Sequence, residues 1–139
     1  MTCLNEFSLP VRVYYEDTDA GGVVYHANYL RFMERARTEW LRALGFEQDR
    51  LAQELGIVFV VASLDIQYRK PARFNDALSV TSSISTVGRV SILFKQEIWR
   101  EGLNNSRELL TTASVKVVCV AMGTFRATTI PTQIREHLQ

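Results

Sequence analysis

The residues with the clearest capacity for chemistry lie in one short segment of the chain. Asp19 precedes the pair Gly21-Gly22, and His26 follows just before a stretch with helical periodicity. Glycines let the backbone approach a ligand closely, and the first N–H groups of a helix have no acceptor inside it. These groups carry the positive end of the helix dipole and stabilise negative charge. The segment therefore favours a reaction in which an oxygen atom becomes negatively charged.

Hydrolysis of an acyl thioester is a reaction of this kind. Charge develops on the former carbonyl oxygen, and backbone N–H donors aimed at that oxygen lower the barrier. A nearby carboxylate either attacks the carbonyl carbon or activates a water molecule. Asp19 is the candidate for this role, although a turn or capping aspartate is the more ordinary interpretation of the spacing alone. Asp17, two residues earlier, is expected to have a structural role.

Further candidates surround this segment. The His26 side chain could transfer a proton, orient a substrate or pack at the helix start. Tyr15 and Tyr25 could line an acyl pocket or belong to the core. Glu34 is expected to form an ion pair with a neighbouring arginine on the same helix. Four cations at strand ends or turns could contact the phosphates of coenzyme A or could simply be solvated; these are Arg69, Lys70, Arg73 and Arg89.

Composition restricts the class of protein. Sixteen basic and fifteen acidic residues give a net charge of +1, so no overall field favours nucleic acid or an anionic membrane. Residues 1–15 lack the apolar run of a secretory signal, and no later segment approaches the roughly 20 apolar residues that span a bilayer. Cys3 and Cys119 are expected to be reduced thiols in a cytoplasmic protein, with neither a metal site nor a cofactor indicated.

The periodicity predicts the elements that position these residues. Apolar positions recur every three or four residues from Asn28 to Leu44, which predicts an amphipathic helix ended by Gly45. A second helix over 48–55 is possible, ending before Gly56. Strands are predicted over 11–16, 57–68, 78–85, 90–98 and 113–121, with a loop over 17–22.

The resulting order, β-α-β-β-β-β, predicts an α+β protein in which a curved antiparallel sheet packs on the long helix. Residues 1–139 are expected to form one domain. A long edge strand is seldom left bare, so pairing with a second copy, giving at least a dimer, is also expected.

One family resemblance accompanies these patterns. The segment from Asp19 to Tyr29 reads DAGGVVYHANY and resembles the hotdog-fold acyl-CoA thioesterases of the 4-hydroxybenzoyl-CoA thioesterase family, most closely the Tol-Pal-associated YbgC type. The likeness continues through Glu34-Arg35-Ala36-Arg37 and, more loosely, through 68–76 and 115–120.

The resemblance implies the hotdog fold and an acyl-CoA or acyl carrier protein substrate. It implies that Asp19 is the catalytic aspartate, as base or nucleophile, and that the backbone N–H of His26 contributes to an oxyanion hole, with Tyr25 and Gly22 helping to position the substrate. A dimer of dimers is implied as well. Two other functions stay open. One is a dehydratase or hydratase with His26 as its base; His137 is too near the end of the chain to assist that reaction. The other is a non-enzymatic adaptor for acyl carrier protein or lipid.

Overall fold

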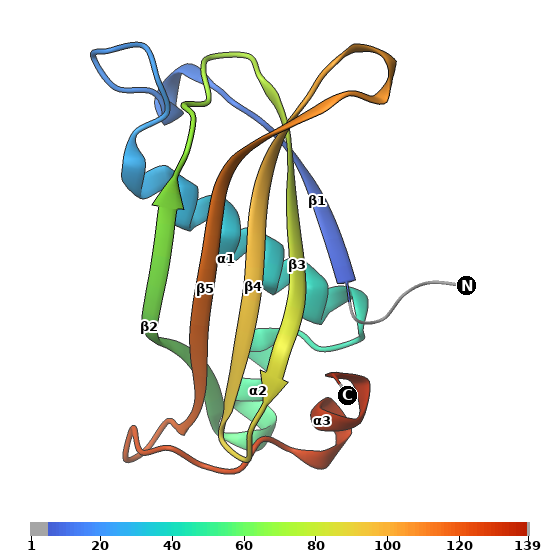
Figure 1. Cartoon of the computed structure of the whole chain (residues 1–139). Helices are drawn as coiled ribbons and strands as arrows, with labels where there is room; N and C mark the ends of the chain where they lie inside the picture. Colours follow the sequence, from blue (N-terminus) through green and yellow to red (C-terminus); the bar gives the residue numbers. More distant parts are fainter. Residues whose placement is uncertain (1–5, 139) are drawn as a thin grey trace.

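The computed structural model describes residues 6–138 as a five-stranded antiparallel sheet with one long helix across a face of it (Figure 1). The strand order is β1-β3-β4-β5-β2. The elements are β1 (Glu6–Arg12), a 3-10 turn (Tyr15–Asp17), α1 (His26–Ala43), α2 (Gln48–Leu55), β2 (Ile57–Tyr68), β3 (Ala77–Val87), β4 (Ser91–Glu101), a second 3-10 turn (Leu103–Asn105), β5 (Arg107–Ala121) and α3 (Thr132–Leu138). The predicted α+β class, with one helix followed by a run of antiparallel strands, is confirmed.

Helix α1 forms because its apolar residues lie along one face. It begins at His26, two residues earlier than the periodicity predicts, because the regular spacing of apolar residues becomes evident only from Tyr29 onward. The backbone leaves the helix at Gly45, whose φ of 99° belongs to the left-handed region that favours glycine. Helix α2 also forms as predicted and ends at Gly56, with φ of 66°.

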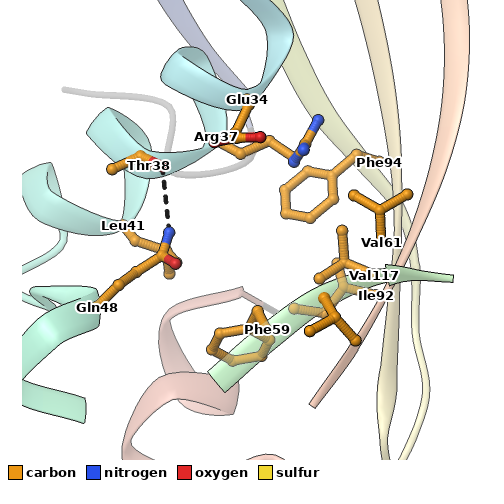
Figure 2. Close-up of a pocket in the computed structure, with 11 residues that line it drawn as sticks. Glu34, Arg37, Thr38, Leu41, Gln48, Phe59, Val61, Ile92, Phe94 and Val117 are labelled. Atoms are coloured by element: carbon orange, nitrogen blue, oxygen red, sulfur yellow. Dashed lines mark hydrogen bonds between the residues drawn. The ribbon is translucent and has the colours of Figure 1, made fainter. Parts of the chain in front are cut away.

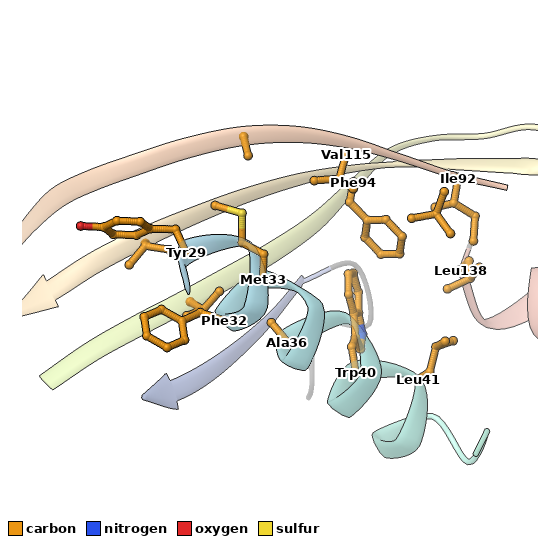
Figure 3. Close-up of a cluster of buried hydrophobic side chains, with 14 of the residues drawn as sticks. Tyr29, Phe32, Met33, Ala36, Trp40, Leu41, Ile92, Phe94, Val115 and Leu138 are labelled. Carbon is orange, nitrogen blue, oxygen red and sulfur yellow. The ribbon is translucent and has the colours of Figure 1, made fainter. Parts of the chain in front are cut away.

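The core lies between α1 and the concave face of the sheet (Figure 3). Phe32, Met33 and Ala36 of α1 are fully buried, and inward-facing residues of β3, β4 and β5 cover them. One inward position of β4 is polar: Gln96 is fully buried and donates to the carbonyl oxygen of Met33, at 3.0 Å, and to Ser82 Oγ, at 2.8 Å. A satisfied polar group of this kind fixes the helix relative to the sheet.

The structure differs from the prediction at three elements. Strand β5 begins at Arg107, six residues before the predicted start at 113. The first strand spans Glu6–Arg12 and pairs with β3, whereas 11–16 was predicted. The extended chain stops because the Asp17 N–H donates to the Tyr14 carbonyl and closes a tight turn. Helix α3 was not predicted, since its seven residues are too few to show a clear helical period.

Strand β2 occupies one edge of the sheet and has a bulge between Val61 and Ser63. Residues 61–65 are all exposed, including two large apolar side chains, Val61 and Leu64, at 44% and 41%. Such an edge is available for pairing with another strand. Within residues 6–138, no helix has the length and apolar character needed to cross a membrane.

Candidate active site

Asp19 lies at the start of a tight hairpin that leads into α1. Thr18 and Val24 pair across it, and the Asp19 N–H donates to the Val23 carbonyl at 2.9 Å. The Gly22 N–H donates back to the Asp19 carbonyl at 3.0 Å. Gly22 has a φ of 81°, so glycine is needed there for the chain to turn. The hairpin thus fixes the backbone of Asp19 from both sides.

The Asp19 carboxylate is exposed, and only one of its two oxygens accepts a hydrogen bond within residues 6–138. Its Oδ1 accepts from the Gly21 N–H at 2.8 Å, so the turn role considered from the sequence is real. Its Oδ2 accepts no hydrogen bond from residues 6–138. A Cβ at position 21 would lie 3.2 Å from Oδ1 and crowd the carboxylate. One oxygen therefore holds the side chain in place while the other remains available for chemistry.

Asp17 ties this region to the helix. It is buried, its Oδ2 accepts from the Tyr14 N–H at 2.8 Å, and its Oδ1 accepts from Asn28 Nδ2 at 2.9 Å. Its carbonyl also accepts from the Tyr25 N–H at 2.9 Å. The predicted structural role of Asp17 is confirmed, because its carboxylate is fully occupied by partners on both sides of the hairpin.

The N-terminus of α1 supplies free backbone donors. The N–H groups of His26 and Ala27 have no acceptor in the described part of the chain, and no side chain caps the helix. Tyr68, at the end of β2, donates its hydroxyl to the His26 carbonyl at 3.0 Å and holds this first residue in place. The His26 ring lies against Tyr25, with ring centroids 4.4 Å apart. The free N–H groups can donate hydrogen bonds to an oxygen that becomes negatively charged during a reaction.

A cleft of about 310 Å³ brings these groups together. Asp19, His26, Tyr29 and Tyr68 all line it. Burial raises the pKa of the Tyr29 hydroxyl, and the charge of Asp19 acts in the same direction. Burial also raises the pKa of the Tyr68 hydroxyl. Both phenols keep their protons at neutral pH. The Tyr68 hydroxyl donates its proton to the His26 carbonyl, whereas the Tyr29 hydroxyl accepts from the Ala72 N–H and can donate its own proton beside the carboxylate.

The other predicted site residues divide into two groups. Arg69 and Lys70 line the same cleft as Asp19. Tyr15 lies outside its lining, 75% exposed, with its ring stacked on Phe74 at 3.8 Å. Arg73 also lies outside the lining, although its backbone bridges to Val23 of the hairpin. The fold thus gathers only two of the four candidate cations around the carboxylate.

Arg89 lies between β3 and β4, at the opposite end of the sheet from the hairpin (Figure 1). His137, on α3, is also outside the cleft lining, and its Nδ1 lies 2.8 Å from the Gln133 carbonyl oxygen.

The expected ion pair of Glu34 does not form with any residue of 6–138, so that prediction was wrong. The neighbouring arginines have other partners. Arg31 donates to Asn28 Oδ1, Arg37 donates to Gln96 Oε1, and the guanidinium of Arg35 lies 5.7 Å from the centroid of the Phe32 ring.

Glu34 instead lines a second cavity, of about 400 Å³, between α1, α2 and the sheet (Figure 2). Its walls are largely apolar and include Leu41, Phe59, Val61, Ile92, Phe94 and Val117. Arg37 and Gln48 add polar atoms, and burial lowers the pKa of the Arg37 guanidinium. This cavity shares no lining residue with the Asp19 cleft.

Sequence reasoning missed several residues that shape the cleft. Tyr29 was assigned only to the apolar stripe of the helix, yet its hydroxyl oxygen accepts from the Ala72 N–H at 3.0 Å. The Ala72 carbonyl in turn accepts from the Val24 N–H at 2.9 Å. The only sequence signal for Tyr68 and Ala72 was the looser family likeness over 68–76, which carried no indication of partners.

Comparison with known proteins identifies the family of this chain. The family model described as the thioesterase superfamily matches residues 21–106. A protein of Haemophilus influenzae named acyl-CoA thioesterase YbgC is 49% identical over 131 residues, which cover 94% of this chain and 93% of that protein. A probable thioesterase of Bartonella henselae has a crystal structure with a TM-score of 0.82 at 32% identity, covering 91% of this chain and 99% of the other.

The fold itself is shared with a more distant enzyme. The structure of 4-hydroxybenzoyl-CoA thioesterase from a Pseudomonas strain has a TM-score of 0.87 at 23% identity and covers 96% of this chain and 99% of that one. This likeness confirms the predicted hotdog fold. On the family match and the identity to curated relatives, the chain belongs to the thioesterase superfamily and, within it, to the YbgC-type acyl-CoA thioesterases.

Proposed function

We propose that this protein hydrolyses acyl-CoA thioesters to a carboxylic acid and coenzyme A, with Asp19 as the catalytic carboxylate. The observation that carries the proposal is the shared cleft: a half-engaged carboxylate and the uncapped N-terminus of α1 line the same surface. The thioesterase names of relatives with 49% identity support the reaction class.

In the proposed reaction, the backbone N–H of His26 donates to the carbonyl oxygen of the thioester as negative charge develops there. The free oxygen of Asp19 attacks the carbonyl carbon or removes a proton from an attacking water. The thiolate of coenzyme A leaves and takes up a proton from solvent. Where Asp19 itself attacks, water then hydrolyses the anhydride between Asp19 and the acyl group, which releases the acid and restores the carboxylate. Gly22 and Tyr25 lie outside the lining of the cleft and are proposed to help position the substrate only through the hairpin and the start of α1. Arg69 and Lys70, which line the cleft, are proposed to contact the coenzyme A phosphates.

An assay of thiol release over acyl-CoA esters of increasing chain length, together with aromatic esters, tests this reaction. We expect release of coenzyme A from at least one ester with multiple turnovers. The same panel includes 3-hydroxyacyl thioesters, for which loss of water without release of thiol would indicate a dehydratase. Tight binding of every ester with no reaction would contradict hydrolysis and favour an adaptor.

Esters of acyl carrier protein are a second candidate form of the substrate. The proposed compartment of the protein is the cytoplasm.

We further propose that the active form is a dimer, or a dimer of such dimers, joined through β2. Antiparallel self-pairing of an edge strand places the early residues of one copy beside the late residues of the other. Phe59 and Val61 of β2 line the second cavity, and Tyr68 at the other end of β2 lines the Asp19 cleft. Pairing would therefore bring the apolar cavity of one copy toward the carboxylate of its partner, where it could receive the acyl group.

The substitution Leu64→Glu tests this assembly. Leu64 is exposed in the middle of β2 beside Asp65, so a further carboxylate adds like-charge repulsion between two copies of the strand. We expect light scattering to give a mass at least twice 15.9 kDa for the unchanged protein and a shift toward 15.9 kDa for the variant. Lys116→Glu, on the neighbouring strand β5, is the matched control and should leave the mass unchanged. A monomeric unchanged protein would contradict the proposal.

A further inference from the structure

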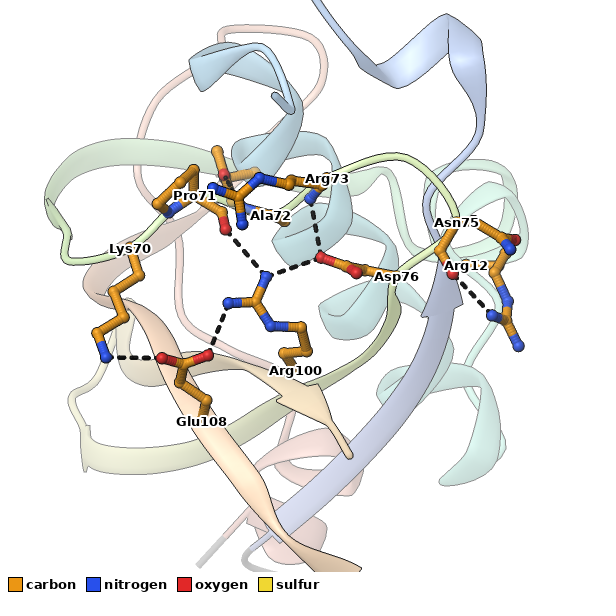
Figure 4. A network of polar contacts seen from close by, with 10 residues as sticks. Arg12, Lys70, Pro71, Ala72, Arg73, Asn75, Asp76, Arg100 and Glu108 are labelled. Carbon is orange, nitrogen blue, oxygen red and sulfur yellow. Dashed lines mark hydrogen bonds and ion pairs between the residues drawn. The ribbon is translucent and has the colours of Figure 1, made fainter. Parts of the chain in front are cut away.

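A single arginine of β4, Arg100, lies at the centre of a polar network (Figure 4) that includes Lys70 and Pro71, two residues that line the Asp19 cleft. The Arg100 side chain is 22% exposed. Its Nη1 donates to Asp76 Oδ2 at 2.8 Å and to the Pro71 carbonyl oxygen at 3.1 Å. Its Nη2 donates to Glu108 Oε1 at 2.6 Å. One guanidinium thus connects the strand β4, the strand β5 and the loop that joins β2 to β3.

The network balances its own charges. Glu108 also accepts from Lys70 Nζ at 2.6 Å, so two carboxylates alternate with two cations. Lys70 and Arg100 lower the pKa of Glu108 to about 2, which keeps this carboxylate charged at neutral pH. Asp76 Oδ2 accepts from the Arg73 N–H as well, at 2.8 Å. Arg100 therefore holds the loop over 69–76 at two points, Pro71 and Asp76, beside the backbone hydrogen bonds that the loop makes with β5 and Val13.

That loop contacts both halves of the candidate active site through Ala72, which is fully buried. The Ala72 carbonyl accepts from the Val24 N–H, in the hairpin that begins at Asp19. The Ala72 N–H donates to the hydroxyl of Tyr29, in the first turn of α1. The loop is the one described segment that bonds to the hairpin and to the Tyr29 hydroxyl through the same residue. A shift of the loop would therefore change the distance between the carboxylate and the helix amides.

We propose that Arg100 is a positioning residue for thioester hydrolysis: through the loop over 69–76 it sets the Asp19 hairpin against the N-terminus of α1. The expected loss of kcat rests on the proposed function, whereas the effect of Arg100 on the loop and the hairpin does not depend on it. Arginine suits the task because its planar fork reaches two carboxylates and a carbonyl oxygen at once. A lysine at this position would reach about one of these acceptors at a time.

The substitutions Arg100→Met and Arg100→Lys test the inference. Supporting residues around catalytic groups commonly contribute about 10- to 100-fold to activity, and small misplacements have losses of this size. We expect Arg100→Met to lower kcat about 10- to 100-fold with KM changed less than about 3-fold, and Arg100→Lys to recover part of the loss. Arg107→Met is the matched control, because Arg107 is exposed near the same end of the sheet and pairs with Glu101 at 3.9 Å. It should retain normal kcat.

Kinetics are measured well below the unfolding temperature of each variant, so that a loss of folded protein does not lower kcat. A second readout needs no turnover: amide hydrogen exchange of Val24 should accelerate in Arg100→Met, while the Gly88 N–H, bonded to the Ser91 carbonyl at the distant end of the sheet, stays unchanged. If Val24 exchange is unaltered, the inference is wrong whatever the activity. If Val24 exchange accelerates but kcat is normal, Arg100 does not position the reaction. Absence of thiol release from the unchanged protein would overturn the proposed function alone, since the exchange measurement still decides the structural claim.

Discussion

Asp19→Asn is expected to lower thioester turnover by at least about 100-fold while leaving the fold intact, a loss comparable to that caused by removing other key catalytic groups. Asparagine keeps an oxygen that can accept from the Gly21 N–H, so the hairpin should close as before. It lacks the negative charge needed to attack a carbonyl carbon or to remove a proton from water. Thiol release, measured with the best ester of the panel, gives the loss directly.

Asp49→Asn is the matched control for this experiment. Asp49 is exposed, and its Oδ1 accepts from the neighbouring Arg50 N–H at 2.9 Å, so it resembles Asp19 in local bonding but lies on α2. We expect this control to retain normal turnover, and both variants to unfold at nearly the same temperature as the unchanged protein. An Asp19→Asn protein that releases coenzyme A at a near-normal rate would remove Asp19 from the mechanism.

Asp17→Ala is expected to have the largest effect on stability, lowering the free energy of unfolding by about 2 to 4 kcal/mol. Two hydrogen bonds to a buried carboxylate disappear, and their donors, the Tyr14 N–H and Asn28 Nδ2, lose their acceptors. Hydrogen bonds to charged groups contribute more than neutral ones, and unsatisfied donors add a penalty. Urea unfolding followed by circular dichroism should show a lower midpoint with an unchanged slope.

Glu16→Ala provides the comparison, since Glu16 occupies the same 3-10 turn but is exposed. Its free energy of unfolding should stay within about 0.5 kcal/mol of the unchanged protein. Equal stability of the two variants would show that Asp17 does not clamp the hairpin to α1. Substitutions at the two aspartates, two residues apart, are thus expected to change different quantities. Position 19 affects turnover, and position 17 affects the free energy of unfolding.

The sequence alone was sufficient to predict the helices and strands in which apolar residues recur at a regular local spacing. Alternation of apolar residues gave β3, β4 and β5, and helical spacing gave α1 to within two residues at its start. Gly45 and Gly56 marked the ends of two helices, because a left-handed conformation has a strong preference for glycine. The first strand was displaced toward the N-terminus in the structure, since its end is set by the Tyr14–Asp17 turn rather than by residue preference.

For the candidate site, the sequence was enough to propose the carboxylate, the glycines that shape its hairpin and the start of the helix behind them, because all of these lie within eight consecutive positions, 19–26. Only the tertiary structure decided that Tyr68 holds the first residue of α1, that Ala72 links the hairpin to Tyr29, and that Arg100 of β4 bonds to the loop that contains Ala72. It also decided that Glu34 faces a cavity instead of an arginine. The physical reason is that these contacts join residues far apart in the chain, and their partners depend on where each strand ends in space, which no local periodicity specifies.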